Sequence, residues 1–128
     1  MGKPYSVKAM SEDLRKKRCI PCEGGIPPLA NEEIAKLMPQ VLGWHVVPVE
    51  KTSRTMDTLQ KTFQFKNFRE AMAFLRRIED LAESEGHHPD FYVHYNRVDF
   101  TIWTHAIGGL HENDFILASK IDQLLENT

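Results

Sequence analysis

The fold is set by the stretch Glu83-Ser-Glu-Gly-His-His-Pro89, which separates a long segment with an apolar stripe from two short alternating segments. Gly86 is expected to end the preceding helix, because glycine tolerates the left-handed backbone of a helix C-terminus. Pro89 cannot continue a helix, so extended chain is expected after it. The hairpin formed there would carry His105 back toward the two histidines of this stretch. Three imidazoles would then meet at one end of a small sheet.

A long helix is predicted on the N-terminal side of this stretch, from Asn67 to Gly86. Asn67 is followed three residues later by Glu70, a pairing typical of a helix N-terminus. Apolar residues then recur at helical spacing and form one wide stripe, which is expected to face the core. The stripe consists of Phe68, Ala71, Phe74, Leu75, Ile78, Leu81 and Ala82.

Two strands, over residues 91–95 and 98–104, are predicted on the C-terminal side. Asn96 lies between them and tolerates the left-handed conformation that a tight turn requires. Side chains alternate along a strand, so two sets are expected on opposite faces. One set is Val98, Phe100 and Ile102, and the other is Asp99, Thr101 and Trp103. A last helix is predicted over residues 113–126.

The chain before the long helix supplies a second pair of strands. A first helix begins at Asn31, which is predicted as its cap because two acidic residues follow it. Strands are expected over residues 44–49 and 59–65, with a polar turn between them. The order helix, two strands, helix, two strands, helix predicts an α+β fold. It would consist of a four-stranded antiparallel sheet with three helices on one face. The open face is a candidate oligomer contact.

Composition narrows the class of protein. The chain has 128 residues, enough for one domain, and a net charge of −2, which gives no electrostatic case for binding nucleic acid or a membrane surface. No apolar run is long enough to span a bilayer. The opening residues are mixed and basic, unlike a signal peptide. Two cysteines are too few for a disulfide scaffold, so we expect a cytoplasmic protein. The basic run Arg15–Arg18 is a candidate nuclear address, although a solvated charge cluster is the simpler interpretation.

Residues 1–28 are predicted to be an N-terminal arm, followed by one domain over residues 29–128. The first 18 residues show no clear core pattern and are expected to be mobile, with a short helix over residues 7–14 as the alternative. Cys19 and Cys22 have the spacing of a metal or redox pair. One such pair supplies only half of a tetrahedral thiolate site, and loop rather than helix follows it. We therefore interpret the two thiols as structural or incidental.

The histidines are the candidate residues for proton transfer. Imidazole has an ordinary pKa of about 6.5, so it can give or take a proton at neutral pH. Two imidazoles on either side of one substrate could remove a proton and deliver another, as the elimination of water requires. His87, His88 and His105 are the candidate catalytic residues. Glu83 and Asp114 are placed to orient them, although a solvated helix surface and a helix cap are their plain alternatives.

Several pieces of the sequence together resemble the signature of the pterin-4a-carbinolamine dehydratases. The matching residues are Glu83-x-x-x-His87-His88-Pro89, Tyr95-Asn96-x-Val98, Thr104-His105 and Gly109-Leu110-x-x-x-Asp114. The resemblance covers the chain from about Leu29 to the C-terminus. Two positions depart from the family pattern. Phe91 stands where many members have tryptophan, and His111 stands where members usually have a capping serine or threonine.

The resemblance implies dehydration of a 4a-hydroxytetrahydropterin to the quinonoid dihydropterin, without a metal or organic cofactor. His87 and His105 would be the acid–base pair, and His88 would orient the substrate together with its neighbours Pro89, Phe91 and Thr104. Glu83 and Asp114 would support the histidines. The product would regenerate the pterin of aromatic amino acid hydroxylases. The family also implies a homodimer or homotetramer.

Two other functions stay open at this point. The first is a non-catalytic binding module, since some animal members of the family act as dimerisation partners of a homeodomain transcription factor. The second is a metalloenzyme, because zinc suits three histidines and a water. Adjacent histidines in extended chain point apart, however, which makes it difficult for His87 and His88 to face one ion.

Overall fold

The computed structural model describes residues 13–51 and 54–126. None of the helices in these ranges has the length and apolar character needed to cross a membrane. The elements are α2 (Asn31–Leu37), β1 (His45–Lys51), β2 (Arg54–Gln64), α3 (Phe68–Glu85), β3 (Asp90–His94), β4 (Arg97–Ile102) and α4 (Glu112–Glu126), with short 3₁₀ helices at Leu14–Lys16, Met38–Gln40 and His105–Ile107.

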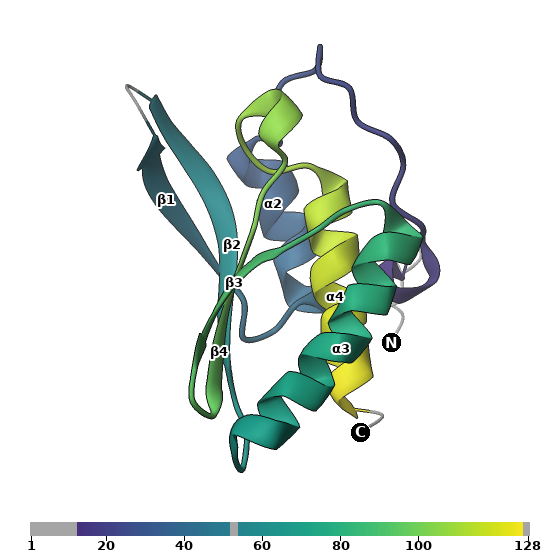
Figure 1. The fold of residues 1–128 in the computed structure, drawn as a ribbon. Coiled ribbons are helices and arrows are strands. Elements are labelled where there is room, and N and C mark those ends of the chain that lie inside the picture. Colours follow the sequence, from purple (N-terminus) through teal and green to yellow (C-terminus); the bar gives the residue numbers. More distant parts are fainter. Residues whose placement is uncertain (1–12, 52–53, 127–128) are drawn as a thin grey trace, which may run out of the picture.

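The four strands form one antiparallel sheet in the order β1-β2-β4-β3. Helices α2, α3 and α4 lie on the same side of this sheet, and the other side carries no helix among the described residues (Figure 1). The predicted α+β architecture is therefore confirmed. The β3 strand is at the edge of the sheet, and the chain enters it directly from α3.

The core lies between the sheet and the helices, as the alternation of β4 predicts. Val98, Phe100 and Ile102 are almost completely buried, whereas Asp99 and Thr101 are on the other face. The Phe100 ring packs edge-on against Phe63 with 5.4 Å between ring centroids. An edge-to-face aromatic pair contributes about 0.5–1.5 kcal/mol beyond the burial of its area. These buried rings therefore mark the face of the sheet that packs against the helices.

The long helix α3 has both of its predicted ends. The Asn67 side chain accepts a hydrogen bond from the backbone N–H of Glu70 at 2.9 Å. Gly86 follows the last helical residue in the left-handed conformation, with φ of 66°. This conformation turns the chain sharply, so His87 and His88 leave the helix axis and lead into β3.

Three local predictions were wrong. β1 and β2 extend through most of the segment expected to be a polar turn, because β2 already begins at Arg54. Tyr95, not Asn96, takes the left-handed conformation of the β3–β4 turn, with φ of 54°. The α2 helix is preceded by Ala30, whose N–H donates to Glu33 Oε1 at 2.9 Å. Asn31 is therefore the first helical residue and not its cap.

The arm also differs from the prediction over the part that the structure describes. Leu14 is fully buried within the main hydrophobic core, although the sequence around it gave no core pattern. Its N–H donates to Gln40 Oε1 at 2.9 Å. Arg15 forms an ion pair with Glu126 at 2.6 Å. Residues 13–18 are thus attached to the helical layer, whereas the alternative helix over residues 7–14 falls mostly outside the described residues.

Candidate active site

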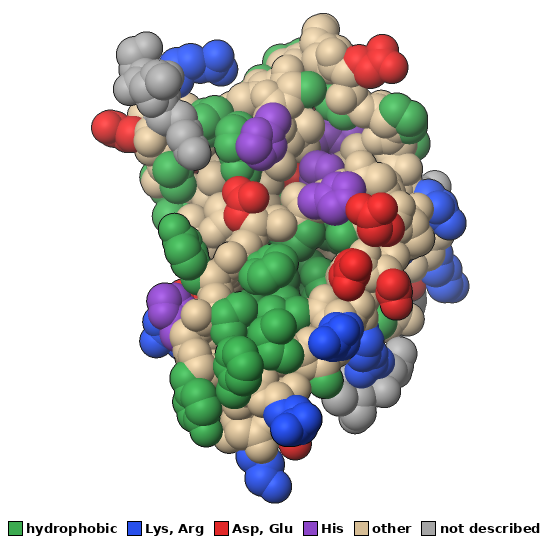
Figure 2. All heavy atoms as spheres, in the orientation of Figure 1, with side chains coloured by type: hydrophobic (Ala, Val, Ile, Leu, Met, Phe, Trp, Pro, Cys, Tyr) green, Lys and Arg blue, Asp and Glu red, His purple; other side chains and the backbone are tan. Residues whose placement is uncertain are grey.

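A polar pocket of about 420 Å³ lies where α3 ends and the 3₁₀ helix after β4 begins. Four of the residues predicted from the sequence line it: His87, His88, Thr104 and His105. In the space-filling view, several histidine side chains gather on one face beside acidic ones and above a hydrophobic patch (Figure 2). The hairpin therefore brings His105 back to the end of α3, as predicted.

Asp114 is the best-anchored polar residue at this pocket. Its side chain is fully buried, and its Oδ1 atom lies 2.6 Å from His87 Nε2. Its Oδ2 atom accepts hydrogen bonds from Thr104 Oγ1 and from the backbone N–H of His111, both at 2.9 Å. An ionised carboxylate only accepts, so His87 Nε2 is the nitrogen that carries the proton in this pair. The Nδ1 atom of His87 is left for a further proton transfer.

The start of α4 explains how Asp114 is held. The residue before the helix, His111, accepts a hydrogen bond from the Asn113 N–H at its Nδ1 atom, at 2.9 Å. Asp114 in turn accepts from the N–H of His111. These two bonds have the reciprocal pattern of a capping box, in which an imidazole occupies the place of a serine or threonine hydroxyl. The unusual histidine at position 111 therefore caps the N-terminus of α4.

His88 has a looser attachment. Its Nε2 atom lies 2.7 Å from Glu83 Oε2, and the two side chains are 57% and 73% exposed. An exposed pair of this kind contributes little to stability, at most about 1 kcal/mol. The sequence predicts that Glu83 orients the histidines, and in the structure Glu83 pairs with His88. The left-handed turn at Gly86 is the reason, because it redirects His87 toward α4.

His105 is held by stacking. Its ring lies against the Trp103 indole with 3.7 Å between centroids and 22° between planes. Within the ranges that the structure describes, no side chain hydrogen-bonds to the His105 ring. The His105 ring is exposed and lines the pocket. Trp103, expected on an open sheet face, also lines the pocket.

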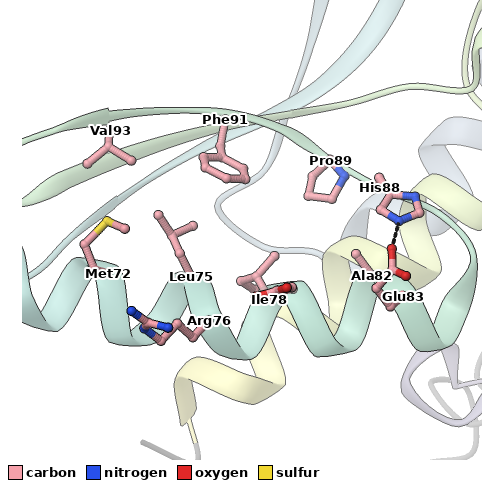
Figure 3. A pocket seen from close by; sticks show the side chains of 11 residues that line it. Met72, Leu75, Arg76, Ile78, Ala82, Glu83, His88, Pro89, Phe91 and Val93 are labelled. Carbon is pink, nitrogen blue, oxygen red and sulfur yellow. Dashed lines mark hydrogen bonds and ion pairs between the residues drawn. The ribbon is translucent and has the colours of Figure 1, made fainter.

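Pro89 and Phe91, predicted to contact the substrate, lie outside this polar pocket. They line an apolar groove of about 450 Å³ between α3 and β3, together with residues such as Leu75 and Ile78 (Figure 3). His88 and Glu83 stand at one end of this groove (Figure 3). His88 therefore belongs to both cavities.

One wall of the polar pocket was not predicted from the sequence. Ile20, Pro21 and Cys22 of the arm line it, as does Asn113 at the start of α4. The apolar pair Ile20-Pro21 beside the cysteines was the only sequence signal for this wall. That signal is weak, because nothing in local spacing connects residue 20 with residue 113.

The two cysteines are free thiols in different surroundings. Burial, reinforced by the nearby Glu85 carboxylate, raises the pKa of the Cys19 thiol to about 12. Cys19 therefore stays protonated at neutral pH and is a poor nucleophile or metal ligand. No three His, Cys, Asp or Glu side chains among residues 13–51 and 54–126 are grouped so that they could hold a metal ion. The zinc hypothesis gains no support from this geometry.

Comparison with known proteins identifies relatives over most of the chain. The family model described as pterin 4 alpha carbinolamine dehydratase matches residues 27–124. A relative from Rubrobacter xylanophilus, provisionally named as such a dehydratase, is 45% identical over 115 residues, which are 90% of this chain and all of the relative. A match of that length reaches back at least to residue 14.

Two further relatives indicate the same family. A protein from Methylococcus capsulatus with the same provisional name is 50% identical over 87% of this chain and 92% of its own. Among solved structures, a transcriptional coactivator/pterin dehydratase from Brucella melitensis superimposes with a TM-score of 0.67. It is 30% identical, and the match covers 76% of this chain and 97% of that one.

Proposed function

Because the chain belongs to the pterin 4 alpha carbinolamine dehydratase family, we propose that it removes water from a 4a-hydroxytetrahydropterin. The product is the quinonoid dihydropterin, and the purpose is to regenerate the tetrahydropterin used by aromatic amino acid hydroxylases. The observation that carries the proposal is that His87 and His105 line one pocket. The first of these is oriented by a buried carboxylate.

The reaction needs one proton removed and one proton delivered. The substrate loses the proton on N5, the 4a-hydroxyl leaves as water after it is protonated, and a C4a–N5 double bond forms. His87 offers its Nδ1 atom, since its Nε2 atom is engaged by Asp114. His105 offers either ring nitrogen. One of the two imidazoles takes the N5 proton and the other protonates the departing hydroxyl, which leaves the pair ready to exchange roles through solvent.

Among the remaining predicted residues, His88 and Phe91 bind the substrate in this proposal, whereas Thr104 supports Asp114. His88, held by Glu83, lies between the polar pocket and the apolar groove and would hydrogen-bond to the pterin. Phe91 is 47% exposed in the groove, so its ring is accessible for packing against a flat heterocycle or its side chain. Thr104 donates its hydroxyl hydrogen to Asp114, and its role is to hold that carboxylate at the pocket wall.

The test is to follow loss of chemically generated 4a-hydroxytetrahydropterin by its ultraviolet absorbance. The parent protein should accelerate the loss, and His105→Ala should lower kcat by about 100-fold or more, in the range of general acid–base catalysis. His94→Ala is the matched control, because His94 is exposed and pairs with Asp99 outside the pocket. Acceleration by His105→Ala equal to that of the parent would refute the acid–base assignment.

We also propose a homodimer or homotetramer in the cytoplasm, which light scattering of the purified protein can test. A second candidate function is that of a protein-binding module for a transcription factor. It is favoured by the Brucella relative, whose name includes transcriptional coactivator, and by the exposed Tyr92 and Tyr95 rings at the sheet edge. A parent protein that neither binds a pterin nor accelerates the dehydration would turn the assignment toward this second function.

A further inference from the structure

We propose that residues 19–22 of the arm form one wall of the substrate site, and that Asn113 is the positioning residue that holds this wall in place. The inference rests on the proposed function, because it assigns these residues to the pterin site. The dehydratase chemistry itself requires only the histidines and their carboxylates. The arm would determine which molecules fit beside them.

Asn113 holds the arm through both ends of its amide. Its Oδ1 atom accepts from the Ile20 N–H at 3.0 Å, and its Nδ2 atom donates to the Ile20 carbonyl oxygen at 2.6 Å. The Asn113 side chain thus bonds to residue 20 as a neighbouring strand would. Asn113 is only 2% exposed, so loss of either bond would leave a buried polar group without a partner, which is unfavourable. The attachment is therefore specific.

A second buried contact fixes the residue before Ile20. The Cys19 N–H donates to Glu85 Oε1 at 2.8 Å, and Lys120 Nζ lies 2.6 Å from Glu85 Oε2. The Glu85 and Lys120 side chains are 4% and 13% exposed. The Cys19 thiol also donates to the Asn113 carbonyl oxygen at 3.5 Å. The arm is thus fixed to the end of α3 and to α4, the two helices that supply His87 and Asp114.

Sequence adjacency joins the two sides of the pocket. Asn113 and Asp114 are consecutive in the first turn of α4, where the first binds Ile20 and the second binds His87. A displacement of this turn would move the arm wall and the His87 ring together. The arm wall offers the apolar surface of Ile20 and Pro21 and the thiol of Cys22. Such a wall suits the face of a flat heterocycle whose polar edge meets the imidazoles.

The test compares two phenylalanine substitutions in the full chain. Cys22 lines the pocket, whereas Glu23 is exposed and does not. Cys22→Phe should weaken binding of 7,8-dihydropterin, a stable substrate analogue, by about tenfold or more, because added bulk in a packed site costs on that order. Glu23→Phe should bind as the parent does. Binding is measured by quenching of tryptophan fluorescence, and thermal unfolding shows that both variants are folded.

Asn113→Ala tests the positioning role. Release of the arm should raise KM by about tenfold with kcat within about twofold of the parent, as expected when binding contacts alone are lost. A fall in kcat at unchanged KM would overturn the inference, because it would place Asn113 with the support of Asp114. If Asn113→Ala does not fold, the comparison of Cys22→Phe with Glu23→Phe still tests whether the arm lines the substrate site.

The outcomes separate this inference from the proposed function. A parent protein that dehydrates and binds the pterin, with Cys22→Phe equal to Glu23→Phe, would refute the arm wall and leave the dehydratase assignment intact. A parent protein that neither binds nor dehydrates the pterin would refute both. Weak binding by Cys22→Phe alone supports the arm wall.

Discussion

Two of the carboxylates on helix α4, Asp114 and Asp122, lie about two turns apart, and their partners differ. Asp114 is fully buried at the pocket and is held by a hydroxyl, a backbone N–H and an imidazole. Asp122 has a 13% exposed side chain and is held by Lys61 Nζ at 2.9 Å and by the Trp44 indole N–H at 3.1 Å. One carboxylate therefore holds an imidazole that lines the pocket, whereas the other holds a lysine that lies over the buried Trp44 ring.

In the proposed mechanism, this difference separates a carboxylate that supports proton transfer from one that stabilises the fold. Burial raises the pKa of Asp122, even though Lys61 and Trp44 favour the ionised form. The ion pair of Asp122 with Lys61 lies beside the buried Trp44 ring. Asp114 instead holds the ring of His87, which lines the pocket.

The largest effect is expected from Asp114→Asn. An amide cannot accept from all three donors, and its N–H₂ group would force His87 to accept at Nε2 and to carry its proton on Nδ1. The wrong tautomer should lower kcat by about 1,000-fold. Steady-state kinetics at saturating substrate measures the loss. If kcat falls less than threefold in a variant that unfolds at the same urea concentration as the parent, Asp114 is no more important for catalysis than Asp122.

The next largest effect is expected on stability, from Glu85→Gln. Loss of the buried charge leaves Lys120 without its counterion, which should lower the free energy of unfolding by about 3 kcal/mol. Although burial opposes ionisation, the Cys19 N–H and Lys120 together hold the pKa of Glu85 below its usual range. Its stabilisation is therefore full above the usual carboxylate pKa and is lost as pH falls through the lower value in the folded state.

Urea unfolding of the parent and Glu85→Gln between pH 7 and pH 3 checks both statements. The gap between the two proteins should narrow as the pH falls. A gap that stays constant would show that the ion pair does not titrate as described.

The smallest effect is expected from Asp122→Asn. Lys61 is 22% exposed and also lies 3.3 Å from the Leu42 carbonyl oxygen, so it can turn toward water when its partner is removed. The free energy of unfolding should fall by about 1 kcal/mol. The dehydration rate should stay within twofold (about 0.4 kcal/mol) of the parent. A large loss of activity in this variant would remove the distinction between the two carboxylates.

Prediction from the sequence succeeded where the signal is local. The apolar stripe of α3, its Gly86 end and the alternation of β4 set the sheet and its buried face, and the segment after Gly86 brought His87 near His105. It failed where partners are far apart in the sequence. Leu14 in the core gives no periodic signal in a short irregular segment.

The candidate site shows the same limit. The motif placed Asp114 beside the histidines, but the choice between His87 and His88 as the partner of Glu83 depends on the direction of the chain after one left-handed residue. The contact of Asn113 with Ile20 spans 93 residues, and no spacing rule reports such a pair.

The attachment of the arm bears on where this protein can be shortened. A chain cut at residue 29, our predicted domain boundary, keeps every strand and α-helix that the structure describes. It would nevertheless lose Leu14 from the core. It would also lose the Cys19 N–H that bonds to Glu85, the partner of Lys120. We therefore expect a shortened form to be stable only if it keeps Leu14 and the arm residues that follow it. Such a form would also keep the proposed arm wall for crystallisation with a pterin.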